Sequence, residues 1–125
     1  MRLLLDSHVV VWWAVYPGRL RDETRSALID PANEVFLSAA SVWELGLKIA
    51  RQKLRLPAGY AVRLLADGFE ELPVSVAHAD RAMMLPALHA DPFDRLLIAQ
   101  ALEEGLVLVT SDREIVRYDV PVMDA

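Results

Sequence analysis

Residues 91–112, DPFDRLLIAQALEEGLVLVTSD, carry the clearest fold signal in the sequence. Asp91 suits a helix N-cap and Pro92 the first helical position, while Gly105 predicts where the helix ends. The apolar run at residues 106–109 then predicts a buried strand. A helix that leads directly into a buried strand is typical of an α/β domain with a mainly parallel central sheet.

The rest of the chain continues this alternation of strands and helices. Strands are expected at residues 2–5 and 35–37, and edge strands at 71–74, which contains Pro73, and at 121–123. Helices are expected at residues 7–16, 22–29, 41–52, 58–67, 78–85 and 113–117. In helix 41–52 we expect Ser41 to be the N-cap, and the apolar side to consist of Val42, Leu45, Ile49 and Ala50. Without a repeat, a low-complexity tract or a long linker, residues 1–125 predict a single domain.

Composition excludes several classes of protein. With 54% hydrophobic and 25% charged residues, the chain can bury a core, which excludes intrinsic disorder. The absence of cysteine excludes disulfides, thiolate metal sites and thiol nucleophiles. No apolar run is long enough to cross a bilayer, and no targeting segment is visible, so we expect a cytoplasmic protein that does not bind membranes.

The formal net charge of −5 is unevenly distributed along the chain. Residues 1–66 hold 9 basic and 6 acidic side chains, whereas residues 67–125 hold 4 basic and 12 acidic ones. Lys48, Arg51, Lys53 and Arg55 form a compact basic stretch. This stretch is either a contact for phosphate groups or a solvated helix face.

Four carboxylates fall where parallel strands end. Asp6 follows the first predicted strand, and Asp112 lies three residues beyond the strand at 106–109. Glu44 lies in the opening turn of helix 41–52, and Asp94 in the first turn of the helix that begins at Pro92. Because ligands bind beyond the carboxyl ends of the strands in open α/β sheets, we expect all four acids at one edge of the sheet.

Each acid taken alone also has a structural explanation. Asp6 and Asp112 could cap the helices that follow them, Glu44 could pair with Lys48, and Asp94 could favour the positive end of a helix dipole. Gathered together, four carboxylates would repel one another and raise their own pKa values. A divalent cation such as Mg²⁺ or Mn²⁺ relieves that repulsion, and such a site supports attack of an activated water on a phosphodiester.

Four segments resemble, in order and at similar spacing, the successive motifs of the PIN-domain ribonucleases. The likeness is greatest to the VapC-type toxins of bacterial toxin–antitoxin pairs. The segments are residues 3–8 (LLLDSH), 38–44 (SAASVWE), 89–101 (HADPFDRLLIAQA) and 108–112 (LVTSD). Together they span nearly the whole chain, and residues 89–101 are the most specific part.

The resemblance implies a three-layer α/β/α sandwich and a metal-dependent endoribonuclease. The family's four acids fall on Asp6, Glu44, Asp94 and Asp112. By this likeness Asp6, Asp94 and Asp112 would bind Mg²⁺ or Mn²⁺, and Glu44 would complete the cluster or orient the attacking water. The cation would activate that water for hydrolysis of RNA.

The resemblance also suggests supporting residues. Asp91 is expected to cap its helix and so orient Asp94, and Ser7, Thr110 and Ser111 to support the acids. Lys48 and Arg51 are candidates to hold RNA phosphates, and Arg95 could pair with an acid. His8 is expected to pack or to face the substrate. His78 and His89 are expected to be structural, and His89 should lie in the loop before Asp91. The role of Glu114 is open.

The implied partners are RNA, a cognate antitoxin and a second copy of the chain. One of Trp12 and Trp13 should lie near the sheet, while the other is either core or exposed in a groove that receives the antitoxin. Two alternatives are a housekeeping PIN nuclease without an antitoxin and a catalytically inactive PIN-like interaction module. The inactive module would lack some of the acids, and all four are present. A receiver domain would need an acid pair after the first strand, where this chain has only Asp6, and is rejected.

Overall fold

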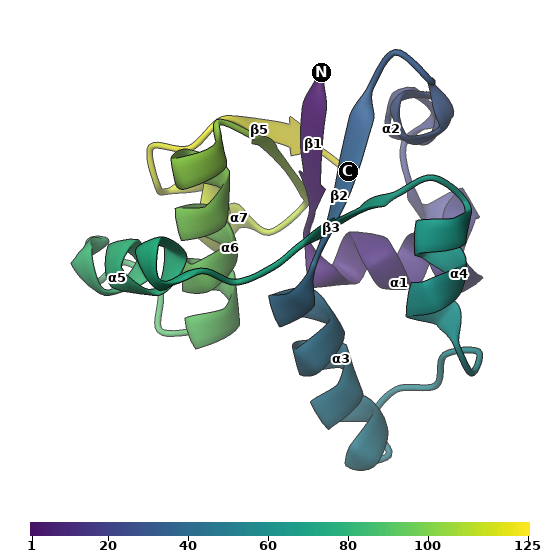
Figure 1. Cartoon of the computed structure of the whole chain (residues 1–125), viewed down its shortest axis with the longest axis horizontal. Coiled ribbons are helices and arrows are strands. Elements are labelled where there is room, and N and C mark those ends of the chain that lie inside the picture. The colour runs from purple at the N-terminus through teal and green to yellow at the C-terminus, as the bar shows by residue number, and fades with distance from the viewer.

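A single parallel sheet organises the chain, whose computed structural model describes all 125 residues (Figure 1). Its strands are β1 (Arg2–Leu5), β2 (Glu34–Ser38), β3 (Glu70–Leu72), β4 (Val107–Thr110) and β5 (Val122–Asp124). Their order in the sheet is β3-β2-β1-β4-β5, and every neighbouring pair is parallel. The predicted edge positions of the strands near Pro73 and Pro121 are therefore confirmed.

Helices cover both faces of this sheet. They are α1 (Ser7–Val15), the 3₁₀ helix η1 (Pro17–Arg19), α2 (Asp22–Ile29), α3 (Ala39–Ala50), α4 (Tyr60–Ala66), α5 (Val76–Met84), α6 (Pro92–Glu104) and α7 (Arg113–Val116). Figure 1 shows α1, α2 and α4 on one side of the sheet and α5, α6 and α7 on the other. None of the helices combines the length and the apolarity that a membrane crossing requires.

The two faces of the sheet bury separate hydrophobic clusters. Along β1, Leu3 and Leu5 belong to the cluster under α1, α2 and α4, whereas Leu4 belongs to the cluster under α6 and α7. This division follows from the period of two in a strand, which sends alternate side chains to opposite faces. The predicted three-layer α/β/α sandwich is thus confirmed.

Both tryptophans of α1 pack against the first of these clusters. Trp12 and Trp13 are half-buried, and the Trp13 ring centroid lies 6.1 Å from that of Phe69. The tryptophan that is most exposed is instead Trp43 on α3, at 64%. The expectation that one of the two α1 tryptophans lies near the sheet is confirmed.

The predictions for α3 were partly wrong. β2 runs directly into the helix without a loop, so the N-cap is Ser38, whose Oγ accepts a hydrogen bond from the Ala40 N–H at 3.0 Å, and Ser41 is buried within the first turn. Leu45 is buried as expected, but Ile49 and Ala50 are exposed because the end of α3 projects beyond the sheet (Figure 1). Other boundaries shift by at most two residues, as is usual at frayed ends.

Candidate active site

Four segments of the chain place the predicted acids at the side of the sheet where the parallel strands have their carboxyl ends. Asp6 directly follows β1, and Asp112 follows the neighbouring strand β4 by two residues. Glu44 lies on α3, which begins where β2 ends, and Asp94 lies in the first turn of α6. In Figure 1 this edge is the lower end of the sheet, where β1 leads into α1 and β2 into α3.

Asp6 and Glu44, here called the inner acids, are tied together through Ser7. Asp6 Oδ1 accepts a hydrogen bond from the Ser7 N–H at 2.6 Å, and Asp6 Oδ2 accepts one from Thr110 Oγ1 at 2.7 Å. The Ser7 hydroxyl donates to Glu44 Oε1 at 2.5 Å. Both acids are buried, Asp6 to 2% and Glu44 to 7% exposure. The pair of Asp6 and Ser7 therefore both caps α1 and links Asp6 to Glu44.

His89, Asp94 and Asp112 form a second group, here called the rim triad. One possible ligand atom from each residue lies within 4.8 Å of the other two. Within the triad, His89 Nε2 lies 2.8 Å from Asp94 Oδ2. Asp91 accepts hydrogen bonds from the N–H groups of Phe93 and Asp94, as its predicted N-cap role requires. The first turn of α6 is therefore fixed at the position that presents Asp94.

Thr110 connects the rim triad to the inner acids. Its hydroxyl donates to Asp6 and also accepts a hydrogen bond from the Asp112 N–H at 3.0 Å. The Asp112 carboxylate in turn accepts from the Glu114 N–H at 2.8 Å, which caps α7. One buried hydroxyl thus links the ends of β1 and β4.

The electrostatics of the site show that the acids influence one another. Burial raises the pKa of Asp94 to about 7, and the charges of Asp6, Asp91 and Asp112 raise it as well, although the hydrogen bond from His89 opposes them. Burial likewise raises the pKa of Asp6, against the hydrogen bond from Thr110, and the charge of Glu44 adds to the increase. The hydrogen bond to Asp94 raises the pKa of His89. The fold therefore brings all four predicted acids into one electrostatic cluster.

Comparison with known families and proteins agrees with this arrangement. The PIN domain family matches residues 3–121 of the chain. The chain is a PIN-domain protein. Over 116 residues this PIN domain is 35% identical to Ribonuclease VapC22 of Mycobacterium tuberculosis, a match that covers 90% of this chain and 88% of that protein.

Solved structures share the fold over nearly the whole chain. VapBC2 from Rickettsia felis, bound to a DNA fragment from its promoter, superposes with a TM-score of 0.76 at 16% identity, covering 100% of this PIN domain and 99% of that chain. A toxin–antitoxin complex from Klebsiella pneumoniae gives a TM-score of 0.64 at 20% identity, covering 98% and 96% of the two chains. At these identities the likeness shows the fold alone.

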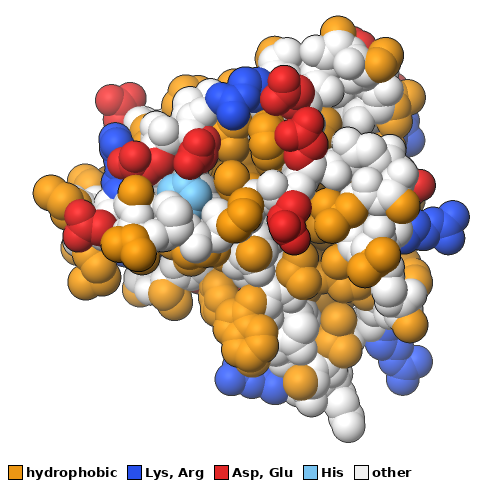
Figure 2. Space-filling model, viewed as in Figure 1, with side chains coloured by type: hydrophobic (Ala, Val, Ile, Leu, Met, Phe, Trp, Pro, Cys, Tyr) orange, Lys and Arg blue, Asp and Glu red, His pale blue; other side chains and the backbone are white.

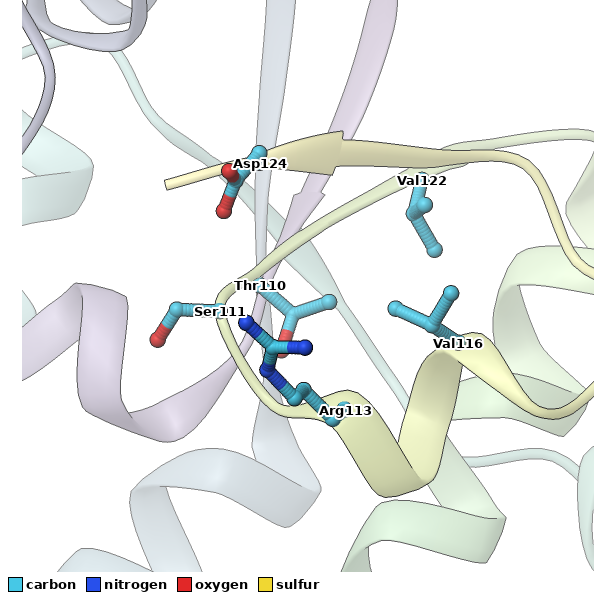
Figure 3. Close-up of a pocket in the computed structure, with 6 residues that line it drawn as sticks. All are labelled: Thr110, Ser111, Arg113, Val116, Val122 and Asp124. Carbon is cyan, nitrogen blue, oxygen red and sulfur yellow. The ribbon is translucent and has the colours of Figure 1, made fainter.

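The supporting residues predicted for this PIN domain divide into two groups. Ser7, Asp91 and Thr110 contact the acids or the main chain that carries them. Ser111 is exposed and instead borders a cavity of about 510 Å³. Figure 3 shows this cavity between the loop after β4, the helix α7 and the edge strand β5, with the Arg113 side chain extending toward Ser111. Thr110, which contacts Asp6, lines the same cavity, whereas Ser111 makes no hydrogen bond to an acid.

The basic stretch lies mostly away from the acids. Lys48 Nζ is 3.4 Å from Glu44 Oε2, so Lys48 reaches the site through the expected i,i+4 pair. Arg51 is exposed at the end of α3. In Figure 2, Lys and Arg side chains flank the projecting end of α3, while acidic side chains gather higher on the same face.

Three side chains near the site make contacts that the sequence did not predict. His89 lies in the predicted loop, but its ring contacts Asp94. Arg95 does not pair with an acid, because its guanidinium donates to three main-chain carbonyls and to the Tyr118 hydroxyl. Glu114, whose role was open, pairs with Arg117. The only sequence signal for His89 was its place two residues before Asp91, in the most specific motif.

The donors at this edge of the sheet fit a divalent cation. Carboxylate oxygens are the ligands that Mg²⁺ and Mn²⁺ prefer, and Asp94 and Asp112 offer them within 4.8 Å of each other. Burial is the main cause of the raised pKa values of Asp6 and Asp94, and the charges of neighbouring acids add to it. A bound cation would favour the ionised form of both carboxylates.

Proposed function

We propose that this PIN-domain chain is a Mg²⁺- or Mn²⁺-dependent endoribonuclease that acts as the toxin of a toxin–antitoxin pair. The observation that carries the proposal is the convergence of Asp6, Glu44, Asp94 and Asp112 at one edge of a parallel sheet. The identity to Ribonuclease VapC22 supports the ribonuclease activity. The similarity to solved VapBC and toxin–antitoxin complexes supports the antitoxin partner.

In the proposed mechanism, three of the acids hold the cation and the fourth acts on the attacking water. Asp94 and Asp112, together with Asp6, would hold Mg²⁺ or Mn²⁺. A bound divalent cation supplies an activated water and offsets negative charge as the phosphodiester is hydrolysed. Glu44 would orient the attacking water, since Ser7 fixes one of its oxygens and Lys48 lies near the other. Thr110 would keep Asp6 and Asp112 in register.

The remaining parts of the proposal concern partners and location. Lys48, beside Glu44, and Arg51, at the exposed end of α3, would contact RNA phosphates along this helix. A cognate antitoxin and a second copy of the chain are the proposed protein partners. The proposed location is the cytoplasm, where cellular RNA is accessible.

An RNA-cleavage assay with a matched control tests the enzyme. The purified full-length chain is incubated with single-stranded RNA and with Mg²⁺, Mn²⁺ or EDTA, next to the variants Asp94→Asn and Asp80→Asn. Asp80 is an exposed acid on α5 and serves as the control. We expect EDTA to stop cleavage, either cation to restore it, and Asp94→Asn to slow it by at least about a hundredfold. Cleavage that persists in EDTA, or in Asp94→Asn at the wild-type rate, would contradict the proposal.

Growth of bacteria that express the chain tests the toxin role. Wild-type expression should arrest growth, and Asp94→Asn expressed to the same level should not. Harmless accumulation of a chain that cleaves RNA in vitro would favour a PIN nuclease without an antitoxin.

A further inference from the structure

His89 occupies a position from which its imidazole could share a cation with the rim acids. Its Nε2 is 2.8 Å from Asp94 Oδ2, and the three possible ligand atoms of the rim triad lie within 4.8 Å of one another. The side chains of His89 and Asp94 remain 20% and 11% exposed, so ions can reach the triad from solvent. Two ligands on opposite sides of an octahedral ion lie about 4.2 Å apart, given bonds of about 2.1 Å. The observed spread therefore needs only a small contraction.

The loop that carries His89 is held by Arg95 and Tyr118. The Arg95 guanidinium donates to the carbonyls of Ala82, Leu85 and Pro86 at 2.7, 3.1 and 2.9 Å. The Tyr118 hydroxyl donates to the Pro86 carbonyl at 2.9 Å and accepts from the His89 N–H at 3.0 Å. These bonds fix the backbone of His89 before any ligand arrives, which lowers the entropic cost of using its ring as a ligand.

We propose that His89 is a nitrogen ligand of the divalent cation, so that the site combines one imidazole with the carboxylates of Asp94 and Asp112. The inference rests on the proposed function of the acid pocket and adds a residue and a metal preference to it. When the ion binds, the proton between His89 Nε2 and Asp94 passes to solvent, and the Nε2 lone pair faces the cation. This step is a proton loss only, and no group changes its oxidation state.

A nitrogen ligand predicts which cation the site prefers. Mg²⁺ binds through oxygen and gives up its waters reluctantly, so an imidazole adds little to its affinity. Imidazole suits divalent transition metals better than it suits Mg²⁺, and Mn²⁺ is the transition metal among them that also suits carboxylates. The His89 site should therefore select Mn²⁺ over Mg²⁺, and this selectivity should depend on the imidazole.

Pulsed electron paramagnetic resonance of bound Mn²⁺ tests the proposal without relying on activity. The full-length wild-type chain loaded with Mn²⁺ should show nuclear modulation from an imidazole nitrogen, and His89→Gln should lose it. The dissociation constant for Mn²⁺ should rise at least about tenfold in His89→Gln, while that for Mg²⁺ should stay within about threefold. His8→Ala is the matched control, because His8 is an exposed histidine on α1 near Asp6, and it should keep the modulation.

Tyr118→Phe provides a second variant that keeps the aromatic packing and removes only the hydroxyl. It should retain the nitrogen modulation and weaken Mn²⁺ binding about threefold, because the loop is held less firmly; unchanged binding would remove Tyr118 from this positioning role. Wild-type chain that binds Mn²⁺ and cleaves RNA but shows no nitrogen modulation would overturn the role of His89 and leave the nuclease intact. Failure to bind any divalent ion and to cleave RNA would overturn both.

Discussion

The inner acids and the acids of the rim triad are neighbours, but they differ in how many of their carboxylate oxygens have a partner within the protein. Both oxygens of Asp6 accept hydrogen bonds, from Ser7 and Thr110, and both oxygens of Glu44 have a partner, in Ser7 and Lys48. In the rim triad, Asp94 accepts from His89 and Asp112 from the Glu114 N–H, each through one oxygen. The second oxygen of each rim acid has no hydrogen bond within the protein.

This difference means that the fold holds the inner acids in place, whereas the rim acids remain available to bind an ion. The inner acids are held by short bonds from residues far apart in the sequence, such as Thr110 and Asp6, so their geometry is set before any ligand binds. The rim acids keep lone pairs free for an ion, at the cost of mutual repulsion. In such a site the free oxygens of Asp94 and Asp112 would face a cation beside an Asp6 carboxylate that is already held in place.

The largest effect on stability should come from removing charge at the rim. Burial raises the pKa of Asp94 from 3.8 to about 7, so the folded chain holds this proton more tightly than the unfolded chain does. Stability therefore falls as pH rises from about 4 to 7, and the full penalty is present above pH 7. At about 1.4 kcal/mol per pKa unit, Asp94→Asn should stabilise the metal-free chain by about 1 to 4 kcal/mol at pH 8 and by little at pH 4.

Urea unfolding at the two pH values measures this difference. Saturating Mn²⁺ should cancel the advantage of Asp94→Asn, because the ion stabilises the wild type by binding its folded state. Asp80→Asn should change stability by less than about 0.5 kcal/mol at either pH. If Asp94→Asn destabilised the chain equally at both pH values, the folded chain would not bind the Asp94 proton more tightly than the unfolded chain does.

A smaller effect is expected from breaking the link between the two groups. Thr110→Val preserves the size of the side chain but leaves Asp6 Oδ2 and the Asp112 N–H without the hydroxyl they share. Unpaired buried polar groups cost about 1–3 kcal/mol, so thermal unfolding should show a loss in that range. Ser111→Ala, at an exposed neighbour, is the control and should be nearly neutral. A neutral Thr110→Val would mean that the inner acids are held independently of β4.

The smallest effects should lie outside both groups, on α3. Lys48→Ala and Arg51→Ala, made in the Asp94→Asn background so that RNA stays intact, should each weaken RNA binding a few-fold. Each should also reduce the slope of log affinity against log salt by about 0.7, the value for one phosphate of a single strand. Arg81→Ala, whose guanidinium on α5 pairs with Glu103 on α6, should change neither quantity. If RNA binding were unchanged in both variants, Lys48 and Arg51 would belong to an ordinary solvated helix face.

The sequence by itself determined the features that depend on neighbours along the chain. The helix from Pro92 to Glu104 was predictable because its cap, its first-turn proline and its terminal glycine act within a few residues. The parallel sheet and the shared edge of the four acids followed from the alternation of strands and helices, because all parallel strands end on the same side. Family motifs then predicted the PIN domain that the comparisons confirm.

Only the tertiary structure decided which groups meet across that edge. The contacts of Thr110 with Asp6 and of Ser7 with Glu44 join residues 104 and 37 positions apart, and no local pattern encodes their distance. The ring of His89 turns toward Asp94 because Arg95 and Tyr118 hold its loop, and those bonds exist only once α5, α6 and the segment after α7 have packed. Local sequence signals determine where helices and strands form, whereas the contacts between distant side chains depend on how those helices and strands pack against one another.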